Sequence, residues 1–252
     1  MTTRNDVLNR VTKEAQYDPV KRAEEMAKIV CRDDLRKYYR FRPARFYGGI
    51  ATADCVGCCL RCIFCWSWRQ VAKPQSYGHF YSPHNVAKEL TKIARKKHFK
   101  LLRISGNEPT LGRGHLLRVL ELIPPDLHFI LETNGILIGH DRTYAQDLAR
   151  FHNLHVRVSL KGANEDEFSA LTGADPTGFM LQIQALENLL RAGVETHPAV
   201  MVSFSPAKHI EDLRNRLKRI DLSFQDVEIE ELVFWGDVEE RLRERGLEFT
   251  TA

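Results

Sequence analysis

The cysteines of this chain are concentrated in one short segment. Six occur in the 252-residue sequence, one at position 31 and the others at 55, 58, 59, 62 and 65. A disulfide framework would spread its cysteines through a small secreted chain, whereas closely spaced thiolates in one loop are typical of a zinc or iron–sulfur site. The segment therefore predicts a metal centre. Three thiolates on a four-iron cluster would also leave one iron open to another ligand.

The spacing of the last three cysteines matches a known signature. The run Cys58-x-x-x-Cys62-x-Phe64-Cys65 resembles the CxxxCxΦC motif of the radical S-adenosylmethionine (radical SAM) superfamily, in which Φ is aromatic. The resemblance implies that Cys58, Cys62 and Cys65 hold a [4Fe–4S] cluster, with Phe64 beside the cofactor. It also implies that S-adenosylmethionine binds the free iron and is cleaved reductively to methionine and a 5′-deoxyadenosyl radical, which abstracts a substrate hydrogen.

Other ligand sets remain open at this stage. Cys55, Cys59 and Cys62 have the same spacing, but Arg61 then takes the place of the aromatic residue, so we favour the later set. A tetrahedral zinc site with four ligands would instead indicate a zinc- or cluster-stabilised binding module without enzymatic activity. Cys31 and the unused cysteines belong either to a second cluster or to the apolar core.

Two turns after predicted strands carry further resemblances. The sequence Gly106-Asn107-Glu108-Pro109 resembles the superfamily's GGEP turn, which contacts the amino group of the cofactor's methionine moiety. The sequence Glu132-Thr133-Asn134-Gly135 resembles the (D/E)TNG strand end of the pyruvate formate-lyase activating enzyme group. We therefore expect the cofactor to be bound by Gly106, Asn107, Glu108, Glu132 and Asn134.

A third strand end, 156–162, contains Ser159 and Lys161, which share one face by the period of two. In the activating-enzyme relatives, the lysine that matches Lys161 helps to hold the cofactor's carboxylate. The resemblance thus adds Ser159 and Lys161 to the expected cofactor-binding residues. The segment after residue 200 resembles the family only weakly, and it yields no adenine-binding residue.

The apolar pattern predicts the elements that position these residues. Short apolar runs at 49–54, 101–105, 129–133, 156–160, 199–204 and 227–232 alternate with amphipathic stretches near 85–97, 115–122, 144–151, 179–192 and 210–220. Such alternation indicates βα units and a parallel sheet, whose strand carboxyl ends carry the chemistry. We expect an α/β fold, a partial (β/α)6 TIM-like barrel over residues 48–232. An open doubly wound sheet is the competing architecture.

The two ends of the chain are expected to extend the barrel. Residues 1–47 are predicted as a helical, basic and aromatic extension, with an amphipathic helix at 20–30. Residues 233–252 are predicted as a C-terminal tail. No apolar run approaches the ~20 residues of a membrane span, and the N-terminus lacks a secretion signal, so we expect a cytoplasmic protein without a membrane partner.

The substrate is less constrained than the cofactor. The "ETNG" and lysine strands resemble enzymes that install a glycyl radical on a partner protein, although the Asp-Gly-Pro-Gly run of those activases is absent. The run Cys62-Ile63-Phe64-Cys65-Trp66 also resembles the wyosine-base synthases, which modify tRNA, and a small metabolite is a further alternative. In the tRNA case, Arg40 and Arg42 would contact phosphates. The resemblance also implies an electron donor of flavodoxin or ferredoxin type.

Overall fold

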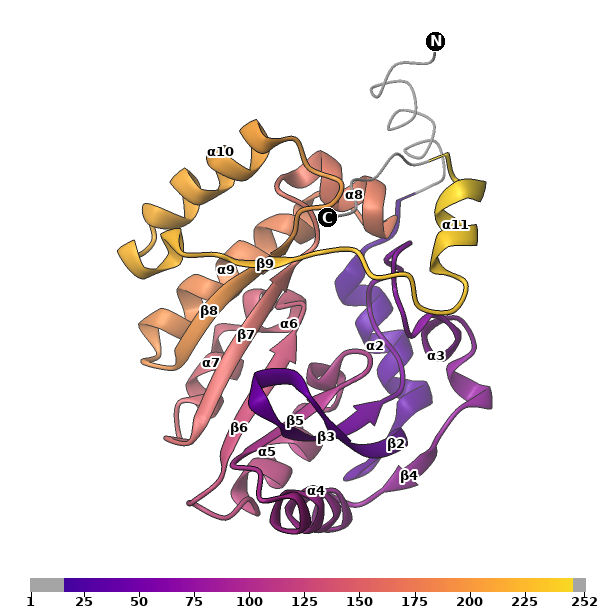
Figure 1. Ribbon diagram of the computed structural model, residues 1–252, viewed down its shortest axis with the longest axis vertical. Helices are drawn as coiled ribbons and strands as arrows, with labels where there is room; N and C mark the ends of the chain where they lie inside the picture. The colour runs from indigo at the N-terminus through magenta and orange to yellow at the C-terminus, as the bar shows by residue number, and fades with distance from the viewer. Residues whose placement is uncertain (1–15, 247–252) are drawn as a thin grey trace.

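Six parallel strands form the centre of the protein. The computed structural model describes residues 16–246. Its sheet has the order β1-β2-β3-β5-β6-β7-β8-β9, with β4 paired to β2. The parallel strands are β3 (Ile50–Cys55), β5 (Leu101–Ser105), β6 (His128–Thr133), β7 (Leu154–Leu160), β8 (Glu195–Met201) and β9 (Glu228–Glu230). The sheet does not close on itself, which confirms the α/β class and the partial six-fold barrel (Figure 1).

Helices connect consecutive parallel strands (Figure 1). They are α4 (Pro83–Lys97), α5 (Arg113–Glu121), α6 (Ile136–His140), α7 (Arg142–Leu148), α8 (Glu165–Thr172), α9 (Thr177–Arg191) and α10 (Ala207–Lys218). The five predicted helical stretches correspond to α4, α5, α7, α9 and α10. Helices α6 and α8 were not predicted from the sequence, because they are only five and eight residues long.

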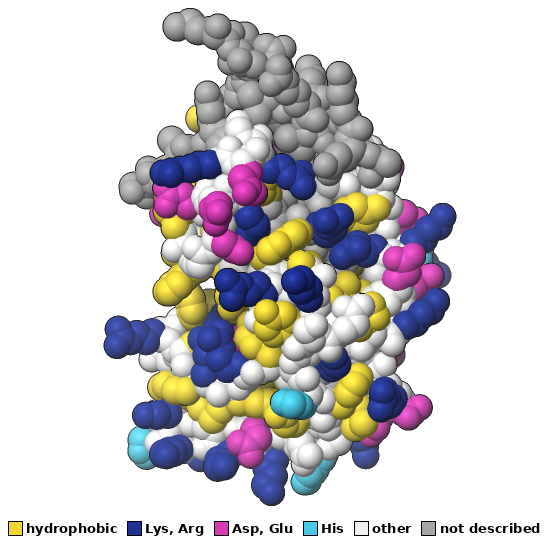
Figure 2. All heavy atoms as spheres, turned by 90° about the vertical axis from the view of Figure 1, so that its right-hand side faces the viewer, with side chains coloured by type: hydrophobic (Ala, Val, Ile, Leu, Met, Phe, Trp, Pro, Cys, Tyr) yellow, Lys and Arg dark blue, Asp and Glu magenta, His cyan; other side chains and the backbone are white. Residues whose placement is uncertain are grey.

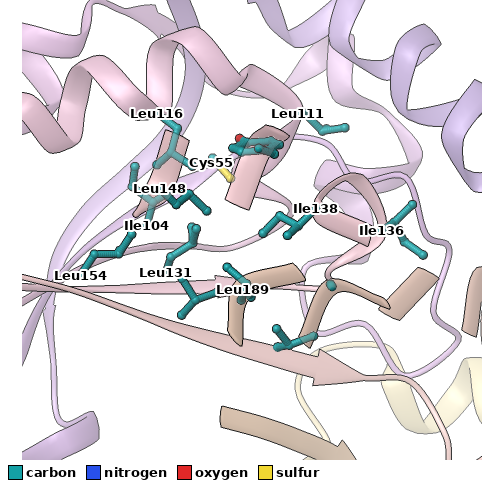
Figure 3. Packing of buried hydrophobic residues seen from close by; sticks show 14 of the residues in the cluster. Cys55, Ile104, Leu111, Leu116, Leu131, Ile136, Ile138, Leu148, Leu154 and Leu189 are labelled. Carbon is teal, nitrogen blue, oxygen red and sulfur yellow. The ribbon is translucent and has the colours of Figure 1, made fainter. Parts of the chain in front are cut away.

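The two faces of the parallel strands differ in character because side chains alternate between them. One face contributes Leu102, Ile104, Leu131 and Val156 to the main core, which packs against the helices (Figure 3). The opposite, inner face of the barrel is largely polar in its upper part. Its residues are Thr52, Asp54, Arg103, Ser105, Glu132, Arg157 and Ser159. The alternation thus collects charged side chains inside the open barrel.

The N-terminal extension is only partly helical. The predicted helix is present as α2 (Pro19–Val30), which begins with Asp18 as its N-cap. The following segment corrects the prediction of helix up to residue 47, because β1 (Cys31–Arg32) and β2 (Leu35–Ala44) are strands and β2 pairs antiparallel with β3. Alternating aromatic and basic residues suit a strand better than a helix. The first 15 residues lie outside the described part of the chain.

Several small elements surround the cysteine segment and the open side of the barrel. The turn between β2 and β3 contains the 3-10 helix η1 (Phe46–Gly48). After the cysteines come α3 (Trp68–Ala72), η2 (Pro74–Ser76) and β4 (His79–Tyr81). The remaining 3-10 helices are η3 (Pro109–Gly112) and η4 (Leu222–Gln225). Within residues 16–246, no helix is long and apolar enough to cross a membrane.

The C-terminal part departs from two predictions. Strand β8 ends at Met201, so the strand predicted at 199–204 begins earlier and stops before the Ser203–Ser205 turn. The predicted tail contains a helix, α11 (Val238–Glu244), which lies beside α3 on the right of Figure 1. The segment that joins β9 to α11 crosses the front of the molecule in the same view.

Candidate functional site

The cysteine loop leaves β3 through a glycine whose conformation the fold requires. Gly57 has φ +90, and a Cβ at this position would lie 2.9 Å from the Sδ atom of Met26. Its N–H donates to the side-chain oxygen of Asn107 (2.7 Å), and its carbonyl accepts from the N–H of Glu108 (3.0 Å). The loop is therefore tied by two hydrogen bonds to the turn that follows β5.

The five clustered cysteines occupy different environments. Cys55, on β3, is fully buried among the apolar side chains between sheet and helices (Figure 3). Cys59 is also fully buried, and its sulfur accepts a hydrogen bond from the Asn134 amide (3.3 Å). Cys58 and Cys65 are partly exposed, and Cys62 is buried at 8% exposure. Only the last three combine a common loop with some access from outside the core.

Burial and one nearby cation determine the acidity of these thiols. A hydrogen bond with Cys59 lowers the pKa of Cys58. Burial raises the pKa of Cys62 well above its ordinary value and that of Cys65 to about 12. The ammonium of Lys161 opposes the increase at both residues. The Lys161 ammonium would therefore partly neutralise the negative charge of thiolate ligands at these positions.

Lys161 belongs to a partly buried network that includes Glu230, a residue not predicted from the sequence. Its Nζ atom lies 3.6 Å from a carboxylate oxygen of Glu230 and donates to the hydroxyl of Ser159. Glu230 also accepts from Ser159 (2.7 Å) and from Arg157 (2.6 Å). Burial opposes the ionisation of Glu230, but Lys161 and Arg157 bring its pKa down to about 2. Glu230 lies on the short edge strand β9, where no motif indicated it.

The same carboxylate keeps Lys161 charged. Burial alone would lower the pKa of Lys161, but Glu230 and the sulfur of Cys62 outweigh burial and raise it. The ammonium also lies 5.9 Å from the centre of the Phe64 ring. Phe64 in turn stacks on Phe204, with ring centres 5.5 Å apart. Lys161 therefore lies close to Phe64 of the cysteine loop.

Glu108 is more deeply buried than an open cofactor ligand would be. One carboxylate oxygen accepts from the hydroxyls of Thr110 and Thr133, both at 2.7 Å, and from the N–H of Thr110. The other accepts from the N–H of Asn134 (2.8 Å). The side chain is 1% exposed. Both oxygens thus join the turn after β5 to the end of β6.

Asn107 and Asn134 also act within the protein. The Asn107 amide donates to the carbonyl of Gly106 (2.8 Å) while its oxygen holds Gly57. The Asn134 amide contacts the sulfurs of Cys59 (3.3 Å) and Cys58 (3.6 Å). Gly106 has φ +95, and a Cβ there would lie 3.0 Å from Asp54, so this turn needs glycine. These three residues set the distance between the cysteine loop and the neighbouring strand ends.

Glu132 points into the barrel and is held by three donors. Its carboxylate accepts from Arg103 (2.6 Å), from the hydroxyl of Ser105 (3.0 Å) and from the hydroxyl of Tyr47 (3.2 Å). Arg103 also donates to Thr52 on β3 (3.0 Å). Tyr47 comes from η1, so this turn reaches over the inner face of the sheet. Glu132 therefore lies at the centre of a polar layer below the cysteine loop.

The two arginines expected to contact substrate face an internal carboxylate. Arg40 and Arg42 lie on β2 opposite β3 and donate through Nε to one oxygen of Asp54, at 2.6 and 2.8 Å. Asp54 is fully buried, so the two guanidinium groups satisfy a charge that would otherwise be costly. The arginine side chains remain 45% and 24% exposed. Their position on a strand, paired with Asp54, differs from the open basic segment that the sequence suggested.

The donor set fits an iron–sulfur cluster. Cys58, Cys62 and Cys65 share one loop, and the cation of Lys161 acts on all three sulfurs. Within the described residues, no group of three or more His, Cys, Asp or Glu side chains is arranged to hold a single metal ion. Three thiols spread over eight positions of one loop, 58–65, suit an iron–sulfur cluster.

The fold is an open barrel of six parallel strands with a polar inner face, and the cysteine loop follows its first strand. Enzymes with barrels of this kind act at the carboxyl ends of the strands. Residues 54–217, more than half of the chain, match the family model of the Radical SAM superfamily. The chain belongs to this superfamily and is a radical SAM enzyme, whose family uses a [4Fe–4S] cluster and S-adenosylmethionine. This membership excludes the non-enzymatic binding module.

Solved structures of radical SAM enzymes share the fold. The enzyme anSMEcpe with bound AdoMet has a TM-score of 0.55 and 21% identity over 70% of this chain and 49% of its own. SuiB of Streptococcus suis, bound to precursor peptide SuiA, has a TM-score of 0.58 and 16% identity over 76% of this chain and 42% of its own. TYW1 with a lysine–pyruvate adduct has a TM-score of 0.55 and 15% identity, with 78% and 71% covered.

These similarities show the fold alone, because all three identities are low. The chain spans less than half of the length of anSMEcpe and SuiB. No curated protein matches the chain.

Proposed function

We propose that Cys58, Cys62 and Cys65 are the protein ligands of the [4Fe–4S] cluster. The observation that carries this proposal is the shared environment of three thiols on one loop with the ammonium of Lys161 beside them. The alternative set needs Cys55 and Cys59, which are fully buried in the core. When bound, the cluster supplies the electron that cleaves S-adenosylmethionine to methionine and a 5′-deoxyadenosyl radical.

Residues at several strand ends are proposed to bind the cofactor or to support its site. Lys161, held by Ser159 and Glu230, is the cation placed to receive the carboxylate of the methionine moiety. Gly106 and Phe64 are proposed to contact the cofactor beside the cysteine ligands. The remaining expected residues, Asn107, Glu108, Asn134 and Glu132, support this site through the internal hydrogen bonds described above.

We propose that the substrate is a polypeptide, in keeping with the resemblance to enzymes that act on a partner protein. The fold is similar to that of SuiB, which was crystallised with a precursor peptide. A tRNA substrate has less support, because Arg40 and Arg42 pair with Asp54 and so are not dedicated to phosphates. Catalysis needs a reductant, and we propose a flavodoxin- or ferredoxin-type donor. The radical SAM barrel is proposed to span residues 48–232.

A fractionated extract tests the substrate class. The reconstituted enzyme is incubated anaerobically with S-adenosylmethionine, dithionite and cell extract, and 5′-deoxyadenosine is measured. We expect the extract to stimulate product formation, and the stimulation to be lost after protease treatment and retained after ribonuclease treatment. Stimulation that is lost only with ribonuclease would indicate RNA, and stimulation that survives both treatments in a low-molecular-weight fraction would indicate a metabolite.

A further inference from the structure

The C-terminal helix contacts the backbone of the cysteine loop through one side chain. Arg241, on α11, donates from one terminal nitrogen to the carbonyl of Ile63 and from the other to the carbonyl of Cys65 (2.6 Å). Both carbonyls belong to a tight turn over residues 62–65, in which the N–H of Cys65 donates to the carbonyl of Cys62 (3.0 Å). A single guanidinium group therefore bridges the turn that presents two of the three proposed ligands.

Arg241 is itself held in position. Its Nε atom lies 3.1 Å from a carboxylate oxygen of Asp237, and its guanidinium carbon lies 5.1 Å from the centre of the Trp68 ring on α3. The side chain is only 14% exposed. The planar group is thus fixed at its base by an ion pair and on one face by an aromatic ring, which leaves its two terminal nitrogens directed at the loop.

Apolar packing joins the same two segments. Val238 and Leu242 of α11 are fully buried and form a small core with Ile63, Leu232 and Phe204, and Phe64 packs against it. A helix of seven residues is not stable alone in water, so α11 depends on this packing. The loop is stabilised in turn, because its carbonyls at 63 and 65 accept charge-assisted hydrogen bonds from Arg241.

We propose that Arg241 is a positioning residue for the cluster, and that α11 is part of the cluster site rather than of a separate tail. Its guanidinium holds the turn that carries Cys62 and Cys65 in the conformation that binds the cluster, and it brings a positive charge to the backbone of Cys65. This inference rests on the proposed assignment of Cys58, Cys62 and Cys65 as ligands.

The same helix provides a matched control. Arg243 is 73% exposed and pairs with Glu239 on its own helix. The full chain and its Arg241→Ala, Arg241→Lys and Arg243→Ala variants are reconstituted anaerobically. Iron and sulfide per chain are measured, together with the rate of cluster loss to a chelator. We expect Arg241→Ala to lose its cluster at least five-fold faster than the original chain, Arg241→Lys to be intermediate, and Arg243→Ala to be unchanged.

A redox titration separates positioning from mere stabilisation of the fold. Removing a cation from the cysteine loop disfavours the more negative reduced cluster, so Arg241→Ala should lower the reduction potential while Arg243→Ala should not. Thermal unfolding of the cluster-free proteins checks that the variants fold. Where Arg241→Ala does not fold, Asp237→Asn, which loosens Arg241 without removing it, should show the same changes to a smaller extent.

The outcomes are distinct. The inference would be overturned if folded Arg241→Ala lost its cluster at the same rate as the original chain and had the same reduction potential. It would also be overturned if Arg243→Ala changed both quantities as much as Arg241→Ala. If Arg241→Ala does not fold, a rate of cluster loss and a reduction potential of Asp237→Asn that equal those of the original chain would overturn the inference as well. Failure of the original chain to bind any cluster would instead refute the proposed ligand assignment.

Discussion

The carboxylate of Glu108, at the end of β5, accepts a 2.7 Å hydrogen bond from the hydroxyl of Thr133 at the end of β6. Two neighbouring strand ends are thus joined through a fully buried acid, which also binds the N–H of Asn134. Asn134 continues the connection to the sulfurs of Cys59 and Cys58. The acid of the GNEP turn therefore acts on the cysteine loop through protein contacts.

The first prediction concerns this acid. Glu108→Ala should lower the free energy of unfolding of the cluster-free protein by about 3 kcal/mol, because four donors lose their acceptor inside the core. Urea unfolding measures the change, and Glu89→Ala on the exposed face of α4 is the control, expected within about 0.5 kcal/mol of the original chain. Unchanged stability together with weakened S-adenosylmethionine binding would assign Glu108 to direct cofactor contact instead.

The second prediction concerns Asp54 and its two arginines. Asp54→Ala should destabilise the protein by about 3–5 kcal/mol, because Arg40 and Arg42 then face each other without the carboxylate. Arg40→Gln should cost less, since Arg42 still pairs with Asp54. Thermal unfolding tests both variants. Bulk tRNA binding that is strong, falls steeply with salt and disappears in Arg40→Gln would instead support the phosphate-binding interpretation.

The third prediction concerns pH. The pKa of Glu230 is lowered to about 2, so its ionic contacts stabilise the folded state above its ordinary pKa of about 4.5 and are lost as the pH falls toward 2. Glu230→Gln should therefore destabilise the cluster-free protein at pH 6 by about 1–3 kcal/mol. The difference should shrink steadily below pH 4.5.

Urea unfolding at several pH values measures this dependence, and the adjacent exposed Glu231→Gln is the control. A Glu230→Gln difference that is constant from pH 6 to pH 2.5 would contradict the ion-pair account of Lys161.

Local patterns predicted most of the fold. The period-two runs at 101–105 and 129–133 became β5 and β6 with almost the same bounds, because each is framed by breakers such as Gly106 and Asn134. The helical prediction for 31–47 was wrong, since pairing of β2 with β3 is a tertiary interaction between distant segments. Similarly, α11 is too short to be recognised from periodicity and exists through its packing on Ile63.

Site residues could be predicted from the sequence only where they belong to a motif. Cysteine spacing and the end of β7 drew attention to Phe64 and Lys161, whose ring centre and ammonium lie 5.9 Å apart. Glu230 and Arg241 were not predicted, because each lies in a segment without a motif. Each contacts residues that are 70 or more positions away in the sequence. The paired state of Arg40 could have been anticipated from Asp54, a lone acid ending an apolar strand.

The most direct test of the ligand assignment is the formation of 5′-deoxyadenosine by the anaerobically reconstituted protein with S-adenosylmethionine and dithionite. The original chain and Cys59→Ala should form it, whereas Cys58→Ala, Cys62→Ala and Cys65→Ala should not, because each removes a thiolate from a cluster with only three. Product formation by Cys65→Ala together with its loss in Cys59→Ala would contradict the account.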